Sequence, residues 1–523
     1  MTPPCQTNSS VDLNMNEPKT ADSHFTTIQK FYNGTNIFIT GGTGFMGKVL
    51  IDKLLRTCPD IENIYLLIRK KKGKDIHTRI EELFDDPLFD KLREAVPKFR
   101  HKIVIIPGDC SIAGLGLSLT DRQTLISNIG IIFHAAATIK FDENLKLAVD
   151  INVHGTKDVI ELSKEMKQLK SFVHVSTAYS NCHLGHVEEK FYDYPIGYEN
   201  LDNIISKLDA RAIEEVTPKI LGKWPNTYTL TKALAEDLVK NECAGLPVSV
   251  FRPAIITSTA SDPIAGWIDN LYGPTGVVAG AGSGVLRTMH CDRNINANIV
   301  PVDMTVNALI VSAYDVARKK SEKNSNEKEV HEIPVYNYVS SVQNPLKWGE
   351  FTQLNMKYGF NYPFSSAIWY ICFFMTKSAF INKVYTLFLH IIPALLIDFM
   401  ILCIGKKPRL LKTYKKIHKF ANVISFFCTN EWTFTNDNVQ KLWRNLNSED
   451  KILYPFDMTP LSWEEYISHY MIGMRMYLFK DDLSNVEVAR KKWRRLFWLH
   501  QSVKVLFITA FSYLMLILCR TII

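Results

Sequence analysis

The sequence predicts an α/β protein with a doubly wound parallel sheet, a helical C-terminal domain and a C-terminal membrane anchor. From residue 31 onward, short apolar runs alternate with helical patterns. These runs are almost continuously apolar, which is typical of parallel strands covered by helices on both faces. A glycine-rich turn after the first run and an uncharged run near the chain end are the other two observations. The predicted strands are 37–40, 64–68, 103–107, 131–135, 172–176 and 248–252, and a last strand is expected at 335–340.

The first predicted strand ends at the glycine-rich turn, and a helical pattern follows it. Gly42, Gly44 and Gly47 match G-x-G-x-x-G, and Gly41, Gly44 and Gly47 match the wider G-x-x-G-x-x-G. Without side chains, the backbone can turn sharply, approach a pyrophosphate and direct helix N–H groups at it. A glycine turn in an unrelated α/β unit is the alternative at this point. We expect a Rossmann-type cofactor site in which the turn contributes Gly41, Thr43, Gly44, Phe45, Met46 and Gly47.

Polar side chains that follow the next two strands are expected to contact the adenosine half of the dinucleotide. Arg69 follows the second strand, where NAD-specific folds place an acidic residue on the ribose 2′-hydroxyl. A guanidinium suits a 2′-phosphate, so we expect NADPH rather than NADH; the alternative is a solvated basic turn. Asp109 follows the third strand and could accept from the adenine amino group, or it forms only an Asx turn or a helix start.

Small residues follow the fourth strand. Ala135 and Ala136 would let a flat ligand approach the backbone closely, whereas His134 before them is interpreted as structural. Asn152 and Pro253 complete the expected cofactor contacts.

A tyrosine and a lysine share one face of a later predicted helix. Tyr228 and Lys232 are four residues apart, so a phenol and an ammonium would line the same side of the site. The cation would lower the phenol pKa and favour proton donation to a developing alkoxide, and Lys232 could also hold the nicotinamide ribose. A hydroxyl from Ser176 or Thr177, at the end of the fifth strand, would bind the same carbonyl oxygen. Taken alone, Y-x-x-x-K is a common accident on any helix.

Taken together, these motifs resemble the extended short-chain dehydrogenase/reductase superfamily. A longer series of segments resembles the fatty acyl-CoA reductases, and the similarity continues through Trp463. That series is T-G-G-T-G-F-M-G-K (40–48), Y-L-L-I-R (65–69), H-A-A-A-T-I-K-F-D (134–142), H-V-S-T-A-Y (174–179), Y-T-L-T-K-A-L-A-E (228–236), F-R-P-A-I-I (251–256), G-A-G-S-G-V-L-R-T-M (280–289) and V-P-V-D-M (300–304).

The resemblance implies NADPH-dependent reduction of a long-chain fatty acyl-CoA to a fatty alcohol, through an aldehyde and with release of CoA. Thr177, Tyr228 and Lys232 would be the catalytic set, with Ser176 as fallback because the two hydroxyls are adjacent. No cysteine nucleophile is required, so Cys182 and Cys291 are interpreted as incidental.

Two other functions are alternatives to this interpretation of the motifs. One is a membrane-bound member of the same superfamily that acts on a sterol or a nucleotide-sugar; segment 280–289 and the helical C-terminal domain count against it. The other is a catalytically idle, NADP-binding membrane scaffold, against which the intact Thr177, Tyr228 and Lys232 set argues.

The charge distribution indicates which classes of ligand the protein binds, and the cysteine content indicates the compartment of its catalytic face. The net charge is +8, and much of the excess lies in clusters at 69–74, 406–416 and 491–495. These clusters suit anionic cofactors and lipid headgroups, and no basic-aromatic motif for nucleic acid accompanies them. The ten cysteines show no metal-binding spacing, so we expect them to be reduced and mostly buried, and the catalytic face to be cytosolic.

Four regions are expected along the chain. Residues 1–23 are polar and resemble a disordered tail, 31–350 form the NADPH-binding domain with substrate-binding insertions, and 355–480 form a helical domain. Within the latter, 364–404 is apolar but broken by charges. Its uncharged runs are too short to span a bilayer as separate helices. Core helices, interfacial or re-entrant helices and a spanning hairpin are all left open.

The end of the chain predicts a membrane anchor. Residues 503–520 are an apolar run bounded by Lys504 and Arg520, and a basic and aromatic segment at 491–498 precedes it. That segment places the N-terminal side in the cytosol, on the endoplasmic reticulum or the peroxisome. The alternative is a buried or interfacial helix. Oligomeric state and chain-length preference are not predicted.

Overall fold

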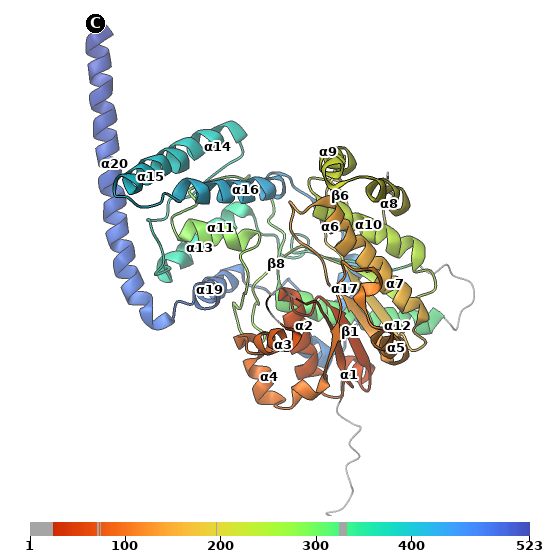
Figure 1. The fold of residues 1–523 in the computed structure, drawn as a ribbon. Coiled ribbons are helices and arrows are strands. Elements are labelled where there is room, and N and C mark those ends of the chain that lie inside the picture. Colours follow the sequence, from red (N-terminus) through yellow and green to blue (C-terminus); the bar gives the residue numbers. More distant parts are fainter. Residues whose placement is uncertain (1–24, 71–72, 74, 195, 324–331, 523) are drawn as a thin grey trace, which may run out of the picture.

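The computed structural model describes residues 25–70, 73, 75–194, 196–323 and 332–522, so the tail expected at 1–23 lies outside it. At its centre is a parallel sheet in the order β11-β7-β5-β4-β1-β2-β3 (Figure 1). The first six predicted strands are present, and the last expected strand, at 335–340, appears as β11 at the edge beside β7. The strands are β1 (Asn36–Thr40), β2 (Ile64–Ile68), β3 (Ile103–Pro107), β4 (Ile129–His134), β5 (Ser171–Val175), β7 (Val248–Pro253) and β11 (Val335–Tyr338).

Helices cover both faces of this sheet, and every strand of the seven except β3 is therefore buried almost throughout. On one face α12 packs against α2, β5 and β7, and elsewhere α7 contacts α5 and α10. These helices and their neighbours are α1 (Thr27–Tyr32), α2 (Phe45–Thr57), α3 (Ile76–Phe84), α4 (Asp90–Ala95), α5 (Leu119–Asn128), α6 (Leu145–Val149), α7 (Gly155–Glu165), α8 (Tyr198–Lys207), α9 (Ala210–Leu221), α10 (Thr227–Glu242) and α12 (Val302–Lys323).

A second, smaller core lies beside the sheet, where α13 packs against α11 and α19. Its buried side chains include Met289 and Cys291 as well as Ile424 and Tyr470, so segments before and after residue 350 share it. Its helices, with those that follow, are α11 (Pro274–Gly282), α13 (Trp348–Asn361), α14 (Ala379–Thr386), α15 (Ile392–Cys403), α16 (Leu410–Thr429), α17 (Asp437–Asn445), α18 (Ser448–Leu453), α19 (Trp463–Gly473) and α20 (Val486–Ile522).

Three short parallel strand pairs connect distant segments. Two of them join the part of the chain before residue 300 to the part after 370, which interleaves the two expected domains. The pairs are β8 (Ile255–Thr257) with β10 (Ile299–Pro301), β9 (Thr288–His290) with β12 (Phe374–Thr376), and β6 (His186–Val187) with β13 (Thr433–Phe434).

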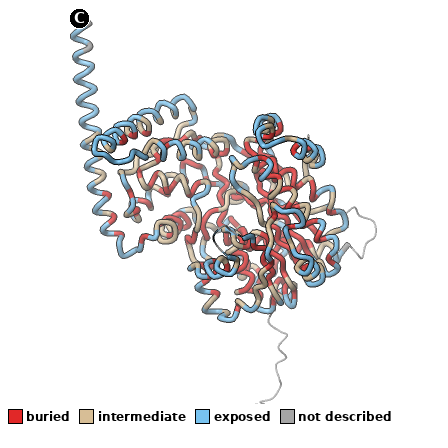
Figure 2. The backbone as a smooth tube through the Cα atoms, viewed as in Figure 1, coloured by how far each residue is buried: buried red, intermediate tan, exposed pale blue. Residues whose placement is uncertain are grey.

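Two helices are long and apolar enough to cross a membrane: Ala379–Cys403 and Leu483–Thr521. The first comprises α14, a π-helical turn at Leu387–Ile391 and α15, so the sequence's broken apolar runs join into one continuous helix. The second contains α20, which begins before the predicted anchor and projects from the body of the molecule (Figure 1). Most side chains on both are exposed, as Figure 2 shows.

Candidate active site

A cavity of about 1360 Å³ lies at the carboxyl ends of the sheet strands, where ligands of doubly wound sheets bind. It brings together residues that are far apart in the sequence. All predicted site residues except Asn152 line it: Gly41, Thr43, Gly44, Phe45, Met46, Gly47, Arg69, Asp109, Ala135, Ala136, Ser176, Thr177, Tyr228, Lys232 and Pro253.

The glycine turn forms one end of the cavity. Gly41 has φ +77°, and a Cβ on it would lie 2.7 Å from the backbone of Ala135 and Ala136. A Cβ on Gly47 would lie 2.3 Å from the carbonyl oxygen of Gly41, so only glycine lets α2 pack this closely on the turn. Gly44 is the N-cap of α2 and has no capping side chain. The N–H groups of the first turn therefore suit an anionic group such as a pyrophosphate.

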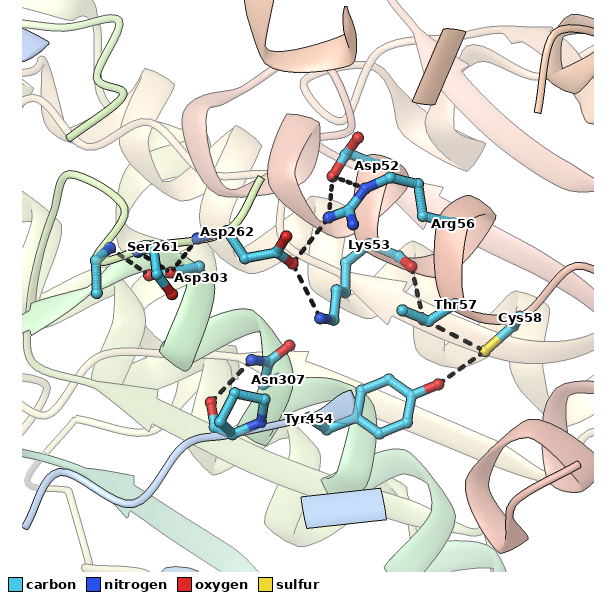
Figure 3. Close-up of polar contacts among 12 residues, drawn as sticks. Asp52, Lys53, Arg56, Thr57, Cys58, Ser261, Asp262, Asp303, Asn307 and Tyr454 are labelled. Atoms are coloured by element: carbon cyan, nitrogen blue, oxygen red, sulfur yellow. Dashed lines mark hydrogen bonds and ion pairs between the residues drawn. The ribbon is translucent and has the colours of Figure 1, made fainter. Parts of the chain in front are cut away.

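A polar network fixes the far half of α2 (Figure 3). Arg56 donates to Asp52 and Asp262, and Lys53 lies 3.0 Å from the same Asp262 carboxylate. The buried Asp303 carboxylate accepts three backbone N–H groups from residues 260–262, at 2.8 to 3.0 Å. This network ties the helix that carries the turn to the loop after β8.

The two residues predicted to contact the adenosine half of the dinucleotide lie at neighbouring strand ends. Arg69 is exposed after β2 and lines the cavity. Asp109 also lines it, and its Oδ1 accepts from the backbone N–H and the hydroxyl of Ser111, at 3.0 and 2.9 Å. The Asx turn that the sequence left as an alternative is therefore present together with the cavity position.

Asn152 lies behind the cavity wall. Its Oδ1 accepts from the Thr138 N–H at 2.8 Å, and its Nδ2 donates to the Thr231 hydroxyl at 2.9 Å. It thus holds the loop after β4 against α10 and does not itself line the cavity. His134 is buried, and both of its ring nitrogens lie within hydrogen-bond distance of threonine hydroxyls, Thr40 at 2.7 Å and Thr156 at 3.1 Å. The prediction that His134 is structural agrees with these contacts.

Tyr228 reaches the cavity from the first turn of α10, which Asn226 caps by accepting from the Thr229 N–H. The ring stacks on Phe141 with centroids 5.6 Å apart. Burial raises the pKa of Tyr228 to about 12, and a hydrogen bond with the Thr177 hydroxyl opposes that rise. The phenol is therefore protonated at neutral pH and able to donate a proton.

Lys232 lies one turn further along the same helix. Its Nζ donates to the carbonyl oxygen of Val175 at 2.7 Å, and burial lowers its pKa to about 8, with Glu236 acting in the opposite direction. The expectation that Lys232 lowers the pKa of Tyr228 is wrong for this structure. The ammonium of Lys232 points at the end of β5, and burial is the main influence on the pKa of the Tyr228 phenol.

The adjacent hydroxyls at the end of β5 have different partners. Thr177 bonds to Tyr228, whereas Ser176 donates to Glu236. Glu236 forms a fully buried ion pair with Arg252, whose Nε and Nη2 lie 2.9 and 2.6 Å from its two carboxylate oxygens. The geometry therefore separates two residues that the sequence could not.

Sequence reasoning missed this Glu236–Arg252 pair as part of the site's support. The spacing in the sequence could have indicated Glu236, because Tyr228, Lys232 and Glu236 lie four residues apart on one helix face.

Among the described residues, no group of three His, Cys, Asp or Glu side chains could hold a metal, and the described cysteines are all free. Cys182 is buried, which raises its pKa to about 12, and Cys291 lines the cavity.

The cavity continues from Tyr228 into an apolar arm. The small residues of α11 form one wall, and side chains from α13, α16 and α19 form the others. The arm is lined by Val277, Val278, Ala281, Gly282, Met289, Phe351, Phe364, Ile371, Phe373, Met375, Phe420, Ile424 and Met471. One connected space thus joins a dinucleotide-type turn, a hydroxyl pair and a long apolar surface.

Comparison with known proteins agrees with this architecture. Residues 39–309 and 389–481 each match a family model described as male sterility protein. The fatty acyl-CoA reductase wat of Drosophila melanogaster is 45% identical over 480 residues, which cover 92% of this chain and 91% of that protein. Human fatty acyl-CoA reductase 1 is 37% identical over 469 residues, 90% of this chain and 89% of that protein. The chain belongs to the fatty acyl-CoA reductase family.

The fold of the reductase also has solved relatives. The reductase domain of a nonribosomal peptide synthetase from Mycobacterium tuberculosis superposes with a TM-score of 0.55 and 18% identity, over 85% of this chain and 92% of that one. The predicted fold class and family are confirmed. The reductase is an oxidoreductase with a domain that binds a nicotinamide dinucleotide.

Proposed function

We propose that the reductase uses NADPH to reduce a long-chain fatty acyl-CoA to a fatty alcohol, through an aldehyde and with release of CoA. The observation that carries this proposal is the single cavity in which the glycine turn, the Thr177–Tyr228 pair and the apolar arm meet. Family membership favours it over a sterol or nucleotide-sugar enzyme and over an idle scaffold.

The residues present fit the proposed cofactor. The α2 N-terminus beyond Gly44 would receive the pyrophosphate, Arg69 the 2′-phosphate and Asp109 the adenine, while Lys232 would contact the nicotinamide ribose. When bound, NADPH supplies a hydride to the substrate carbonyl carbon. The side chains of this chain supply the proton and the polar groups around it.

The proposed chemistry follows from the hydroxyls of Thr177 and Tyr228, which lie between the glycine turn and the apolar arm. Thr177 and Tyr228 donate hydrogen bonds to the thioester oxygen as it becomes an oxyanion. Hydride addition and protonation give a hemithioacetal, whose collapse breaks the C–S bond and releases CoA and an aldehyde. The aldehyde carbon would accept a hydride from a second NADPH, and Tyr228, reprotonated from solvent, would donate the proton that completes the alcohol.

Membrane attachment through α20 suits this substrate, because the acyl chain and the alcohol both partition into lipid. We place the catalytic part on the cytosolic face of the endoplasmic reticulum or the peroxisome, because the basic segment 491–495 in the first part of α20 precedes its apolar run.

The test is incubation of the purified, detergent-solubilised chain with palmitoyl-CoA and NADPH. We expect thiol release and hexadecanol from the wild type and neither from Tyr228→Phe. Absence of CoA release from a wild-type protein that binds NADPH would overturn the proposal. A Tyr228→Phe variant that retains full cellular function would favour the scaffold instead.

A further inference from the structure

The helix Ala379–Cys403, with its π-helical turn, carries an exposed apolar stripe. Phe380, Val384, Phe388, Ile392 and Leu396 recur at every fourth position, and Phe399 and Met400 continue the stripe. Phe388 is 61% exposed and Phe399 65%, which is unusual for phenylalanine on a helix that packs against a folded body.

The opposite face of the same helix is attached to the protein along its whole length. The attached residues, Asn382, His390 and Asp398, are spaced eight residues apart. Asn382 accepts from the Thr288 hydroxyl at 2.9 Å, and His390 accepts from the Arg287 N–H at 2.8 Å.

Asp398 supplies the third attachment. Its carboxylate accepts the N–H groups of residues 409–411, at 2.9 to 3.1 Å, and so caps the start of α16. Asp398 is the only Asp, Glu, Lys or Arg between Val384 and Ile404, and both Asp398 and His390 are buried on the attached face, away from the exposed stripe. The stripe from Val384 onward is therefore free of charge.

A helix attached to the protein at three successive points cannot cross a bilayer independently of the catalytic domain. It can, however, lie in the membrane surface with its free face in the acyl region. We infer that the exposed face of 379–404 is a second membrane contact, which lies in the plane of the bilayer, while α20 spans it. Its occupant is lipid.

Two further observations favour lipid. Exposed basic residues follow the stripe directly (Lys406, Lys407, Arg409, Lys412 and Lys415), which would attract anionic headgroups and would repel a second copy of this face. The segment that leads into the stripe is also attached to the anchor, because the Trp369 indole donates to His500 of α20 at 3.1 Å. In Figure 1, α20 projects from the body and α14 and α15 lie across its direction. The segment between Trp369 and α14 contains Ile371, Phe373 and Met375 of the apolar arm, which places the arm near the lipid surface.

The inference is tested without any turnover assay. The full chain is reconstituted into nanodiscs of phosphatidylcholine and phosphatidylserine that contain a phospholipid with a photoreactive diazirine, either near the glycerol or at the acyl end. After irradiation, adducts are mapped by peptide mass spectrometry. We expect the glycerol-proximal probe to label 380–404 from end to end, and the acyl-end probe to label α20 but not 380–404.

A variant pair provides the control. Phe388→Glu/Leu396→Glu/Phe399→Glu should lower adducts on 380–404 at least tenfold. Leu119→Glu/Ile452→Glu, at residues that are 88% and 79% exposed, should leave them unchanged. Unchanged NADPH binding and melting would show that both variants fold. Labelling graded from one end of 380–404 to the other would indicate a spanning helix. Adducts on α20 alone, or crosslinks to a second copy, would also overturn the inference.

Discussion

The Nζ of Lys232 donates a hydrogen bond to the carbonyl oxygen of Val175, 2.7 Å away, at the end of the central strand β5. This contact directs a buried ammonium to the end of β5, beside Ser176 and Thr177, where the nicotinamide ribose would bind. Because burial opposes its charge, the pKa of Lys232 falls from the ordinary lysine value to about 8.

Activity should therefore decline in mildly alkaline solution. The lysine pKa is lowered, so its charge is complete below about pH 7 and is lost as the pH rises through about 8. We expect kcat/KM for acyl-CoA to fall with that midpoint. The Tyr228 phenol, with a pKa of about 12, keeps its proton over this range, so it does not add a second decline to the pH profile. A profile that stays flat to about pH 10 would contradict the role given to Lys232.

The two adjacent hydroxyls should differ in what their loss affects. Thr177→Val removes a donor to the oxyanion and should lower kcat by about 10²–10³, with little change in stability. Ser176→Ala removes a hydrogen bond to the buried Glu236 and should lower the free energy of unfolding by about 1–3 kcal/mol with a smaller effect on kcat. Steady-state kinetics and urea unfolding of both variants measure this; the reverse pattern would make Ser176 the catalytic hydroxyl.

The buried ion pair under the site should be a strong determinant of stability. Arg252→Met leaves the Glu236 carboxylate buried without its partner and should cost about 3–5 kcal/mol. Arg211→Met breaks a pair with Glu215 that is largely exposed and should cost less than about 1 kcal/mol. Denaturant unfolding of the two variants, each compared with the wild type, gives both values, and equal costs would refute the assignment.

The glycine turn offers a direct test of cofactor binding. Gly47→Ala places a Cβ 2.3 Å from the Gly41 carbonyl oxygen, so the turn or α2 must shift. We expect NADPH to bind at least about tenfold more weakly, a loss of about 1.4 kcal/mol. The matched control is Gly185→Ala, where an added Cβ meets nothing within 4 Å. Fluorescence titration with NADPH measures both, and equal affinities would count against this turn as the pyrophosphate site.

Much of the sheet and its turn could be predicted because local patterns determine them. The strands are mostly apolar. The close approach of Gly47 to Gly41, which only glycine permits, involves residues that are near each other in the sequence. Most of the site residues also follow strand ends, where the parallel topology gathers them.

What the sequence could not predict depends on contacts between distant segments. Ser176 and Thr177 are separated only by the positions of Glu236 and Tyr228. The burial that raises the Tyr228 pKa comes from surrounding segments and outweighs the hydrogen bond with Thr177. The charged Asp398 breaks an apolar pattern in sequence, yet in the fold it caps α16 and leaves the helix continuous.

The proposed two-step reduction is tested most directly by the position of the transferred hydrides. The purified chain is given palmitoyl-CoA and NADPH that carries deuterium at both C4 positions, and the products are analysed by mass spectrometry. Two successive reductions at one carbon predict hexadecanol with both deuterium atoms at C1, and one CoA released for every two NADPH consumed. An aldehyde with a single deuterium as the final product, or an alcohol without deuterium at C1, would contradict the account.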